Sequence, residues 1–224
     1  MSEPVLPCVE IEPRRRADAA VVWLHGLGAD GHDFEPVVPE LGLPPSAAVR
    51  FVFPHAPAIA VSLNYGMVMP AWYDIAGPDL RRTRHDEEGI RRSAARVEAL
   101  IARERERGVA ADRIVLAGFS QGGAIAIHTA LRHRERLAGL VALSTYLLLE
   151  DALERELSDA NRALPVLMCH GTFDPMVPED RGRACRDRLT SLGYAVDWHT
   201  WPMEHQVCRE EIGVVGAFLR ERLA

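Results

Sequence analysis

Short runs of aliphatic and β-branched residues recur along this chain, with longer segments of helical periodicity between them. The runs cover residues 20–24, 50–53, 113–117, 140–143, 165–170 and 195–200, with 9–12 as a weaker candidate at an edge. Most are apolar throughout rather than alternating, which is typical of strands buried on both faces. Strands alternating with helices predict an α/β fold, with a mostly parallel central sheet and helices on both faces.

The helical segments are recognised by their periodicity and by their ends. Residues 90–101 carry apolar side chains at helical spacing, and Gly108 follows where a C-cap belongs. Further helices are predicted over residues 120–133, 179–192 and 206–223. Because 224 residues suffice for one well-filled core, we expect residues 1–224 to form a single domain without a large separate cap domain.

Residues 54–85 interrupt this alternation, because prolines and glycines break every period over a stretch too long for an ordinary connection. We expect this segment either to pad the core or to form the wall or lid of a pocket. Exposed apolar residues here would serve a homodimer interface as well as a ligand. The apolar residues without a predicted helix or strand to bury them are Ile59, Val61, Leu63, Met67, Val68, Met69 and Trp72.

Composition and charge exclude several classes of function. The formal net charge is −6 and no stripe of basic residues is visible, which argues against nucleic-acid binding. All 26 basic residues are arginine, so Schiff-base lysines, Walker A sites and Ser-Lys dyads are excluded. No apolar run reaches the roughly 18 residues of a membrane span, and the N-terminus lacks a signal-peptide pattern. We therefore expect a cytoplasmic protein without stable membrane insertion.

Neither a metal nor a cofactor is predicted. Cys8, Cys169, Cys185 and Cys208 are widely spaced without a C-x-x-C pair, so we interpret them as reduced, mostly buried thiols. The stretch "GLGADG" matches a dinucleotide loop in its glycines alone. It lacks the ribose-binding acid of that motif, and two prolines break the helix that should follow.

The stretch Gly118-Phe119-Ser120-Gln121-Gly122 matches G-x-S-x-G, and its context gives the match its meaning. A buried strand runs into it and a helix leaves it, which places Ser120 in a sharp turn above the C-terminal end of the strand. The flanking glycines would let strand and helix approach closely. Ser120 is therefore either a reactive nucleophile or a small residue at a tight bend.

A serine nucleophile needs a histidine to remove its proton and a carboxylate to orient that histidine. In an α/β-hydrolase arrangement these partners follow the serine in the order acid, then histidine, each on a loop after a later strand. Asp174 follows the run 165–170, and His205 follows the run 195–200. We expect Ser120, Asp174 and His205 to form a catalytic triad.

Other residues of the same types fit less well. His199 lies inside a predicted strand, and His128 lies two turns into the helix after Ser120. His170 is expected to pack under the loop that carries Asp174. Glu179 and Asp180 more naturally start the following helix.

An oxyanion hole needs two N–H donors aimed at the reacting carbonyl oxygen. We expect one from the backbone of Gln121, which follows the nucleophile. The other should come from the loop "WLHGLGADGHDF" after the first core strand, where Gly26 and Gly28 let the backbone turn inward. We assign this second donor to Leu27.

Six stretches in order, "LHGLGADGHDF", "FPHAP", "MPAWYD", "GFSQGG", "HGTFDPMVP" and "MEHQVC", resemble the carboxylesterase and acyl-protein thioesterase family of small α/β-hydrolases. The resemblance runs from about residue 21 to the C-terminal helix. It implies a hydrolase without a cofactor, with Ser120, Asp174 and His205 as its triad and Leu27 and Gln121 as oxyanion donors. It also implies an acyl groove beside the serine, lined by Leu63, Trp72, Tyr146, Leu147, Met176 and Val177.

Three positions depart from the family pattern. Glu204 and Gln206 flank His205 where eukaryotic thioesterases often have small residues, and Tyr65 stands where a glycine is expected in the pocket loop. These departures leave the triad intact and argue against long-chain acyl-protein activity.

The leading hypothesis is a serine carboxylic-ester hydrolase that acts on short- to medium-chain acyl esters through an acyl-enzyme. Its substrate would be a small-molecule or lipid acyl ester. Within the same chemistry, the alternative is an acyl-protein thioesterase or a lysophospholipase. From a different class, the chain could be a catalytically silent binding module on a hydrolase fold.

Overall fold

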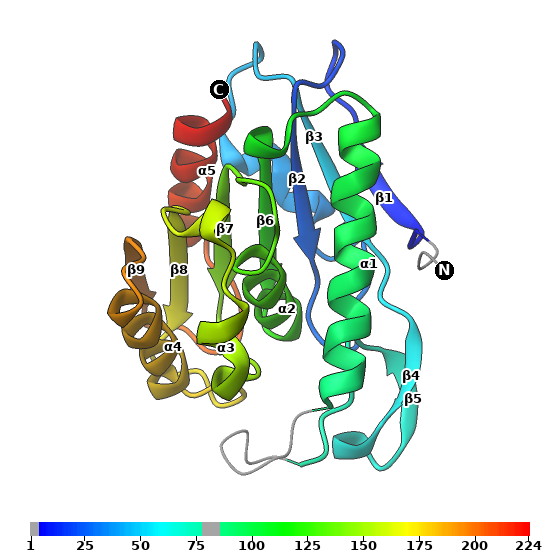
Figure 1. The fold of residues 1–224 in the computed structure, drawn as a ribbon, viewed down its shortest axis with the longest axis vertical. Helices are drawn as coiled ribbons and strands as arrows, with labels where there is room; N and C mark the ends of the chain where they lie inside the picture. Colours follow the sequence, from blue (N-terminus) through cyan, green and yellow to red (C-terminus); the bar gives the residue numbers. More distant parts are fainter. Residues whose placement is uncertain (1–4, 78–85) are drawn as a thin grey trace.

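The computed structural model describes residues 5–77 and 86–224, and its centre is a seven-stranded sheet in the order β1-β3-β2-β6-β7-β8-β9 (Figure 1). β1 runs antiparallel to β3, whereas the other neighbouring strands are parallel. The predicted mostly parallel sheet is confirmed, and every predicted strand is present. The strands are β1 (Cys8–Ile11), β2 (Ala19–Leu24), β3 (Val49–Pro54), β6 (Ile114–Phe119), β7 (Gly139–Leu143), β8 (Val166–Gly171) and β9 (Val196–Trp201).

Helices cover both faces of the sheet, as predicted. α1 (Glu87–Glu106), α2 (Gln121–Ala130) and α4 (Glu179–Ser191) pack on the face that Figure 1 shows in front. α5 (Arg209–Leu223) and the 3-10 segment η1 (Glu35–Leu41) pack together on the opposite face. In the part of the chain that the structure describes, no separate cap domain stands over the sheet.

The strands are apolar throughout because each contributes to two cores. In β2, Val22 and Leu24 join the cluster under α1 and α2, whereas Val21 and Trp23 join the cluster under α5. All six residues of β2 are buried, as are all six of β3 and of β8. β9 lies at the sheet edge and is only partly buried. The two-faced burial inferred from the sequence is thus confirmed for the central strands.

Helix boundaries differ from the prediction near the loops of interest. α2 begins at Gln121 because Ser120 has a positive φ of 54° and cannot belong to the helix. α5 begins at Arg209, so that residues 206–208 extend the loop that carries His205. The short helix α3 (Glu150–Glu156), after β7, was not predicted, since its seven residues are too few for a clear helical period.

No strand was predicted within residues 54–85, but the structure has two there. β4 (Ala58–Val61) and β5 (Met67–Pro70) pair as an antiparallel hairpin. Tyr65 and Gly66 make its turn with positive φ values of 56° and 78°. Two residues of β5 are exposed, and prolines flank the hairpin, so neither strand shows a plain alternation in the sequence. The last part of the segment, residues 78–85, lies outside the described residues.

Two further expectations concern membranes and metals. Among residues 5–77 and 86–224, no helix is both long and apolar enough to cross a membrane. The same residues contain no group of three or more His, Cys, Asp or Glu side chains that could hold a metal ion.

Candidate active site

Ser120 lies in the sharp turn between β6 and α2 that the sequence predicted. Its backbone has φ 54° and ψ −121°, a strained conformation for a residue with a side chain. The Ser120 N–H donates to the Leu143 carbonyl at 2.9 Å, and the Thr145 hydroxyl donates to the Ser120 carbonyl at 2.7 Å. Neighbouring strand ends therefore hold the turn in this conformation.

Glycine is required on both sides of Ser120 by close backbone contact. A Cβ atom on Gly118 would lie 2.5 Å from backbone atoms of Gly122. A Cβ atom on Gly122 would lie 2.4 Å from the His25 carbonyl oxygen. The two glycines thus let α2 start directly against the ends of β6 and β2.

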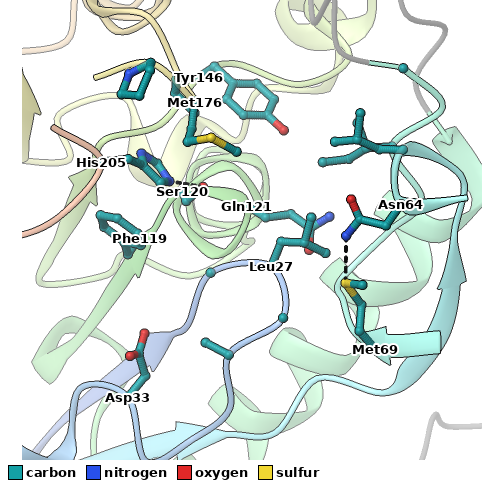
Figure 2. A pocket seen from close by; sticks show the side chains of 18 residues that line it. Leu27, Asp33, Asn64, Met69, Phe119, Ser120, Gln121, Tyr146, Met176 and His205 are labelled. Carbon is teal, nitrogen blue, oxygen red and sulfur yellow. Dashed lines mark hydrogen bonds between the residues drawn. The ribbon is translucent and has the colours of Figure 1, made fainter. Parts of the chain in front are cut away.

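Ser120, His205 and Asp174 form one hydrogen-bonded chain. The Ser120 hydroxyl donates to His205 Nε2 at 2.9 Å, and His205 Nδ1 donates to Asp174 Oδ2 at 2.6 Å. Figure 2 shows the His205 ring directed at Ser120 from a separate loop. The Phe119 ring packs against His205 with its centroid 4.7 Å away. Three loops that are distant in the sequence thus bring these side chains into contact.

Asp174 is held in its ionised form. Its Oδ1 accepts from the backbone N–H groups of Met176 at 2.9 Å and Val177 at 2.8 Å. Burial by itself raises the pKa of Asp174, but the His205 hydrogen bond and these N–H donors outweigh burial and lower it. An ionised carboxylate at this position keeps the His205 proton on Nδ1 and leaves Nε2 free to accept.

The rival histidines lie elsewhere. His199 points from the edge strand β9 to Asp197, at 2.9 Å. His128 is buried inside α2, and burial lowers its pKa to about 3. His170 Nε2 donates to the Val177 carbonyl at 2.8 Å, which places it beneath the Asp174 loop as expected.

Two residues beside Ser120 are candidates for the oxyanion donors: Leu27 on the loop after β2, and Gln121 at the start of α2. Gly28 has a positive φ of 79°, and its own N–H donates to the Pro70 carbonyl at 2.8 Å. The N–H groups of Leu27 and Gln121 have no acceptor within the described part of the chain. Both residues line the same pocket as Ser120, so their assignment as oxyanion donors stays a prediction that this geometry permits.

A buried hydrogen-bond network that sequence reasoning missed holds this loop. The Gln121 side chain accepts from the Trp72 N–H at 2.8 Å and donates to the Tyr73 carbonyl at 2.8 Å. The Trp72 indole donates to the His25 carbonyl at 2.8 Å. His25 Nδ1 donates to the Gly26 carbonyl at 2.7 Å, while its Nε2 accepts from the Ala56 N–H at 3.0 Å. The two hydrogen bonds of Trp72 join residues that are separated by 49 and 47 positions along the chain. Contacts over such separations leave no local pattern in a sequence.

A pocket of about 750 Å³ opens beside Ser120 and His205. Four of the residues that the resemblance assigned to an acyl groove line it: Leu63, Tyr146, Met176 and Val177. Met69, one of the apolar residues of the candidate pocket wall, also lines it, and so do Ile75, Asn64 and Asp33, which were not assigned from the sequence. The volume lies within the range usual for small-ligand sites, roughly 300–1,000 Å³. The described part of residues 54–85 therefore forms a wall of this pocket.

Two assignments to the groove need correction. Trp72 is 1% exposed and Leu147 is 7% exposed, and neither lines the pocket. Both belong to the core under α1 and α2, and the Trp72 indole is engaged with His25. An aromatic or leucine residue close to a site in the sequence can belong to the hydrophobic core or line the pocket. The sequence alone did not distinguish these two places. The three departures, Tyr65, Glu204 and Gln206, are all exposed and do not line the pocket.

Comparison with known proteins agrees with this geometry. A family model described as phospholipase/carboxylesterase matches residues 7–223. Acyl-protein thioesterase 1 of Neurospora crassa is 42% identical over 217 residues, which are 93% of this chain and 88% of that protein. Acyl-protein thioesterase 1 of Yarrowia lipolytica is 37% identical over 224 residues, 98% of this chain and 99% of that protein.

Solved structures give the same result. The crystal structure of Zea mays acyl-protein thioesterase 2 matches with a TM-score of 0.86 and 28% identity, covering 97% of this chain and 99% of that chain. Arabidopsis thaliana SOBER1 matches with a TM-score of 0.85 and 26% identity, covering 91% and 98%. The family match spans nearly the whole chain and includes every loop of the site. The chain therefore belongs to the phospholipase/carboxylesterase family of α/β-hydrolases.

Proposed function

We propose that the protein hydrolyses carboxylic esters with short to medium acyl chains, through an acyl-enzyme on Ser120. The observation that carries this proposal is the unbroken hydrogen-bonded chain from Asp174 through His205 to Ser120, which ends in an apolar pocket. No cofactor is part of the proposed reaction.

In the first step, Ser120 Oγ attacks the ester carbonyl carbon while His205 Nε2 takes the hydroxyl proton. The N–H groups of Leu27 and Gln121 donate to the carbonyl oxygen as it becomes negative. His205 then gives its proton to the departing alcohol, and the acyl group stays on Ser120. Water repeats the same steps, releases the acid and restores the serine. Asp174 stays ionised throughout and stabilises the imidazolium.

Chain length is proposed from the pocket. Leu63, Ile75 and Val177 give the pocket an apolar lining, to which the Tyr146 ring also contributes. The Tyr146 hydroxyl is paired with the buried hydroxyl of Tyr73 at 2.7 Å, which favours a fixed position for that ring. Acyl chain and alcohol share this pocket, and the fixed Tyr146 ring is the feature proposed to limit the acyl part to short and medium chains.

A second candidate is hydrolysis of thioesters, including S-acylated protein. It is favoured by the relatives named acyl-protein thioesterase 1, at 42% and 37% identity. The same triad chemistry serves both, because a thiolate replaces the alcohol as leaving group. Lysophospholipid esters remain within this chemistry as well.

For location we propose the cytoplasm, because none of the four cysteines is paired and reducing compartments keep thiols in that state.

The deciding experiment is a series of acyl esters and matching thioesters from two to sixteen carbons, with Ser120→Ala as the blank. We expect kcat/KM to be highest on short and medium oxygen esters. A maximum on long chains or on thioesters would replace the proposal with the second candidate. Rates equal to those of the blank on every substrate would favour a silent binding module.

The Gln121 side chain offers a separate test of how the oxyanion donors are positioned. Gln121→Ala keeps the backbone N–H but leaves the Trp72 N–H and the Tyr73 carbonyl buried without partners, which costs about 1–3 kcal/mol for each group. We expect kcat to fall about tenfold or more while KM for a short ester changes little, because the loop loses its fixed position. Steady-state kinetics measure this, with Gln121→Glu as the matched variant that removes one donor. An unchanged kcat in a folded Gln121→Ala protein would contradict a positioning role.

A further inference from the structure

One charged side chain faces the pocket without a partner. Asp33 is the single Asp, Glu or Arg among the described residues that line the pocket. Within the described chain it forms no side-chain hydrogen bond or ion pair. It is also not a helix cap, because η1 has Phe34 at its N-cap position and no side-chain cap bond.

The Asp33 carboxylate is not stabilised by its surroundings. Partial burial raises its pKa, and the negative charge of Asp30 adds to this effect. Asp33 is exposed to solvent where it lines the pocket. Because no cation, cap or N–H donor of the described chain contacts its carboxylate, that carboxylate is free to interact with a ligand.

Asp33 lies apart from Asn64 and Met69, two pocket residues of the segment 54–85. In Figure 2, Asn64 and Met69 lie on one side of Leu27, and Asp33 lies on the other, with its carboxylate directed toward Phe119. If the acyl chain occupies the part lined by Leu63, Ile75 and Tyr146, the part lined by Phe119 and Asp33 is left for the alcohol. The carboxylate then stands at the leaving-group side of Ser120.

We propose that Asp33 selects substrates whose leaving alcohol or thiol carries a positive charge. This inference rests on the proposed acyl transfer and specifies its substrate class. A cation at this place gains Coulomb attraction from Asp33, and an alkylated ammonium also packs favourably beside an aromatic ring such as Phe119. An anionic leaving group is repelled. The cation itself takes no part in bond making, since the departing oxygen or sulfur receives its proton from His205.

The test uses butyrate esters that differ in charge. Butyrylcholine is compared with 3,3-dimethylbutyl butyrate, its uncharged isostere, and with the anionic 3-sulfopropyl butyrate. Wild type is expected to favour them in the order cationic, neutral, anionic. Asp33→Asn is expected to lower the choline-to-dimethylbutyl ratio of kcat/KM about three- to tenfold, as befits a charge at an exposed rim. High salt screens the Asp33 charge and should therefore also lower the choline-to-dimethylbutyl ratio of wild type.

Glu35→Gln is the matched control, because it removes a carboxylate charge only two residues along the chain from Asp33. The Glu35 side chain pairs with His32 and does not line the pocket. Its ratio should equal that of wild type. Asp33→Ser is the second variant, and thermal unfolding checks that both Asp33 variants are folded.

A thioester pair distinguishes the source of the cation. Two S-butyryl-cysteine peptides, one with an arginine beside the cysteine and one with glutamine there, are compared in the same variants. A loss of charge preference in Asp33→Asn for this pair alone would identify a basic peptide as the cation, and a loss for the choline pair alone would identify a small alcohol. Equal ratios in wild type and Asp33→Asn for both pairs would overturn the inference. Failure of wild type to hydrolyse even the neutral ester would instead contradict the proposed function.

Discussion

Ser120→Ala, His205→Ala and the double variant are expected to hydrolyse a short ester at the same residual rate, about 10⁴- to 10⁶-fold below wild type. The two side chains act on one proton: His205 Nε2 accepts it from the Ser120 hydroxyl across 2.9 Å. Once either partner is missing, the other has no proton transfer left to perform. The remaining rate then comes from substrate binding and from the Leu27 and Gln121 N–H donors alone.

Single-turnover and steady-state rates on one ester measure this result, and His199→Ala serves as the control. His199 lies on the edge strand β9 and pairs with Asp197, so its removal should leave the rate near that of wild type. Losses that multiply in the double variant would contradict a shared proton transfer. A fluorophosphonate probe gives a second readout, since it should label the tryptic peptide 114–132 in wild type and not in Ser120→Ala.

The free energy of unfolding of wild type is expected to fall as pH rises, and Glu211→Gln is expected to abolish most of this fall. Glu211 lies in the first turn of α5, is 0% exposed, and its carboxyl oxygens form no hydrogen bond within the described structure. Burial raises its pKa to about 8, and the nearby Cys208 backbone N–H, which is not within hydrogen-bond geometry, lowers it by a smaller amount. The buried carboxyl group therefore keeps its proton at neutral pH in the folded protein and loses it in the unfolded chain.

The sign of the effect follows from proton binding. Between an ordinary value of 4.5 and about 8, the folded state holds a proton that the unfolded state has released. Rising pH therefore lowers the free energy of unfolding across this window, by at most about 5 kcal/mol. Water penetration on partial opening reduces that limit. The amide that Glu211→Gln introduces cannot ionise, so the variant should lose much less stability over the same range.

Urea unfolding of both proteins from pH 5 to pH 9 measures this difference. Burial lowers the pKa values of His25, His128 and His170, which makes stability rise with pH in the acidic part of the range. Because these histidines are present in both proteins, subtracting the Glu211→Gln profile from that of wild type isolates Glu211. Parallel profiles would show that Glu211 does not titrate in the folded protein. The substitution lies outside the pocket, and its kinetics should match wild type.

Much of the site could be predicted because its signals are local. The strand that leads into Gly118-Phe119-Ser120-Gln121-Gly122 is apolar throughout, and parallel strands bring the loops at their carboxyl ends to one edge. Together with the acid-then-histidine order of an α/β-hydrolase, this led us to expect Asp174 and His205 beside Ser120, and hydrogen bonds of 2.6 Å and 2.9 Å join the three. Their catalytic roles stay a prediction until the variants are measured.

What the sequence could not supply is the pairing of side chains across long separations. The chain by itself determined the α/β class, the order of the strands along it, and the loops that meet at the serine, because burial period and turn chemistry are properties of neighbouring residues. Only the tertiary structure decided that Trp72 is a buried core residue, hydrogen-bonded to Gln121, and does not line the pocket. It also decided that residues 58–70 form a hairpin. It alone placed Asp33 at the pocket without a partner. The physical reason is that these outcomes depend on which distant groups share a small volume, and no local propensity encodes that.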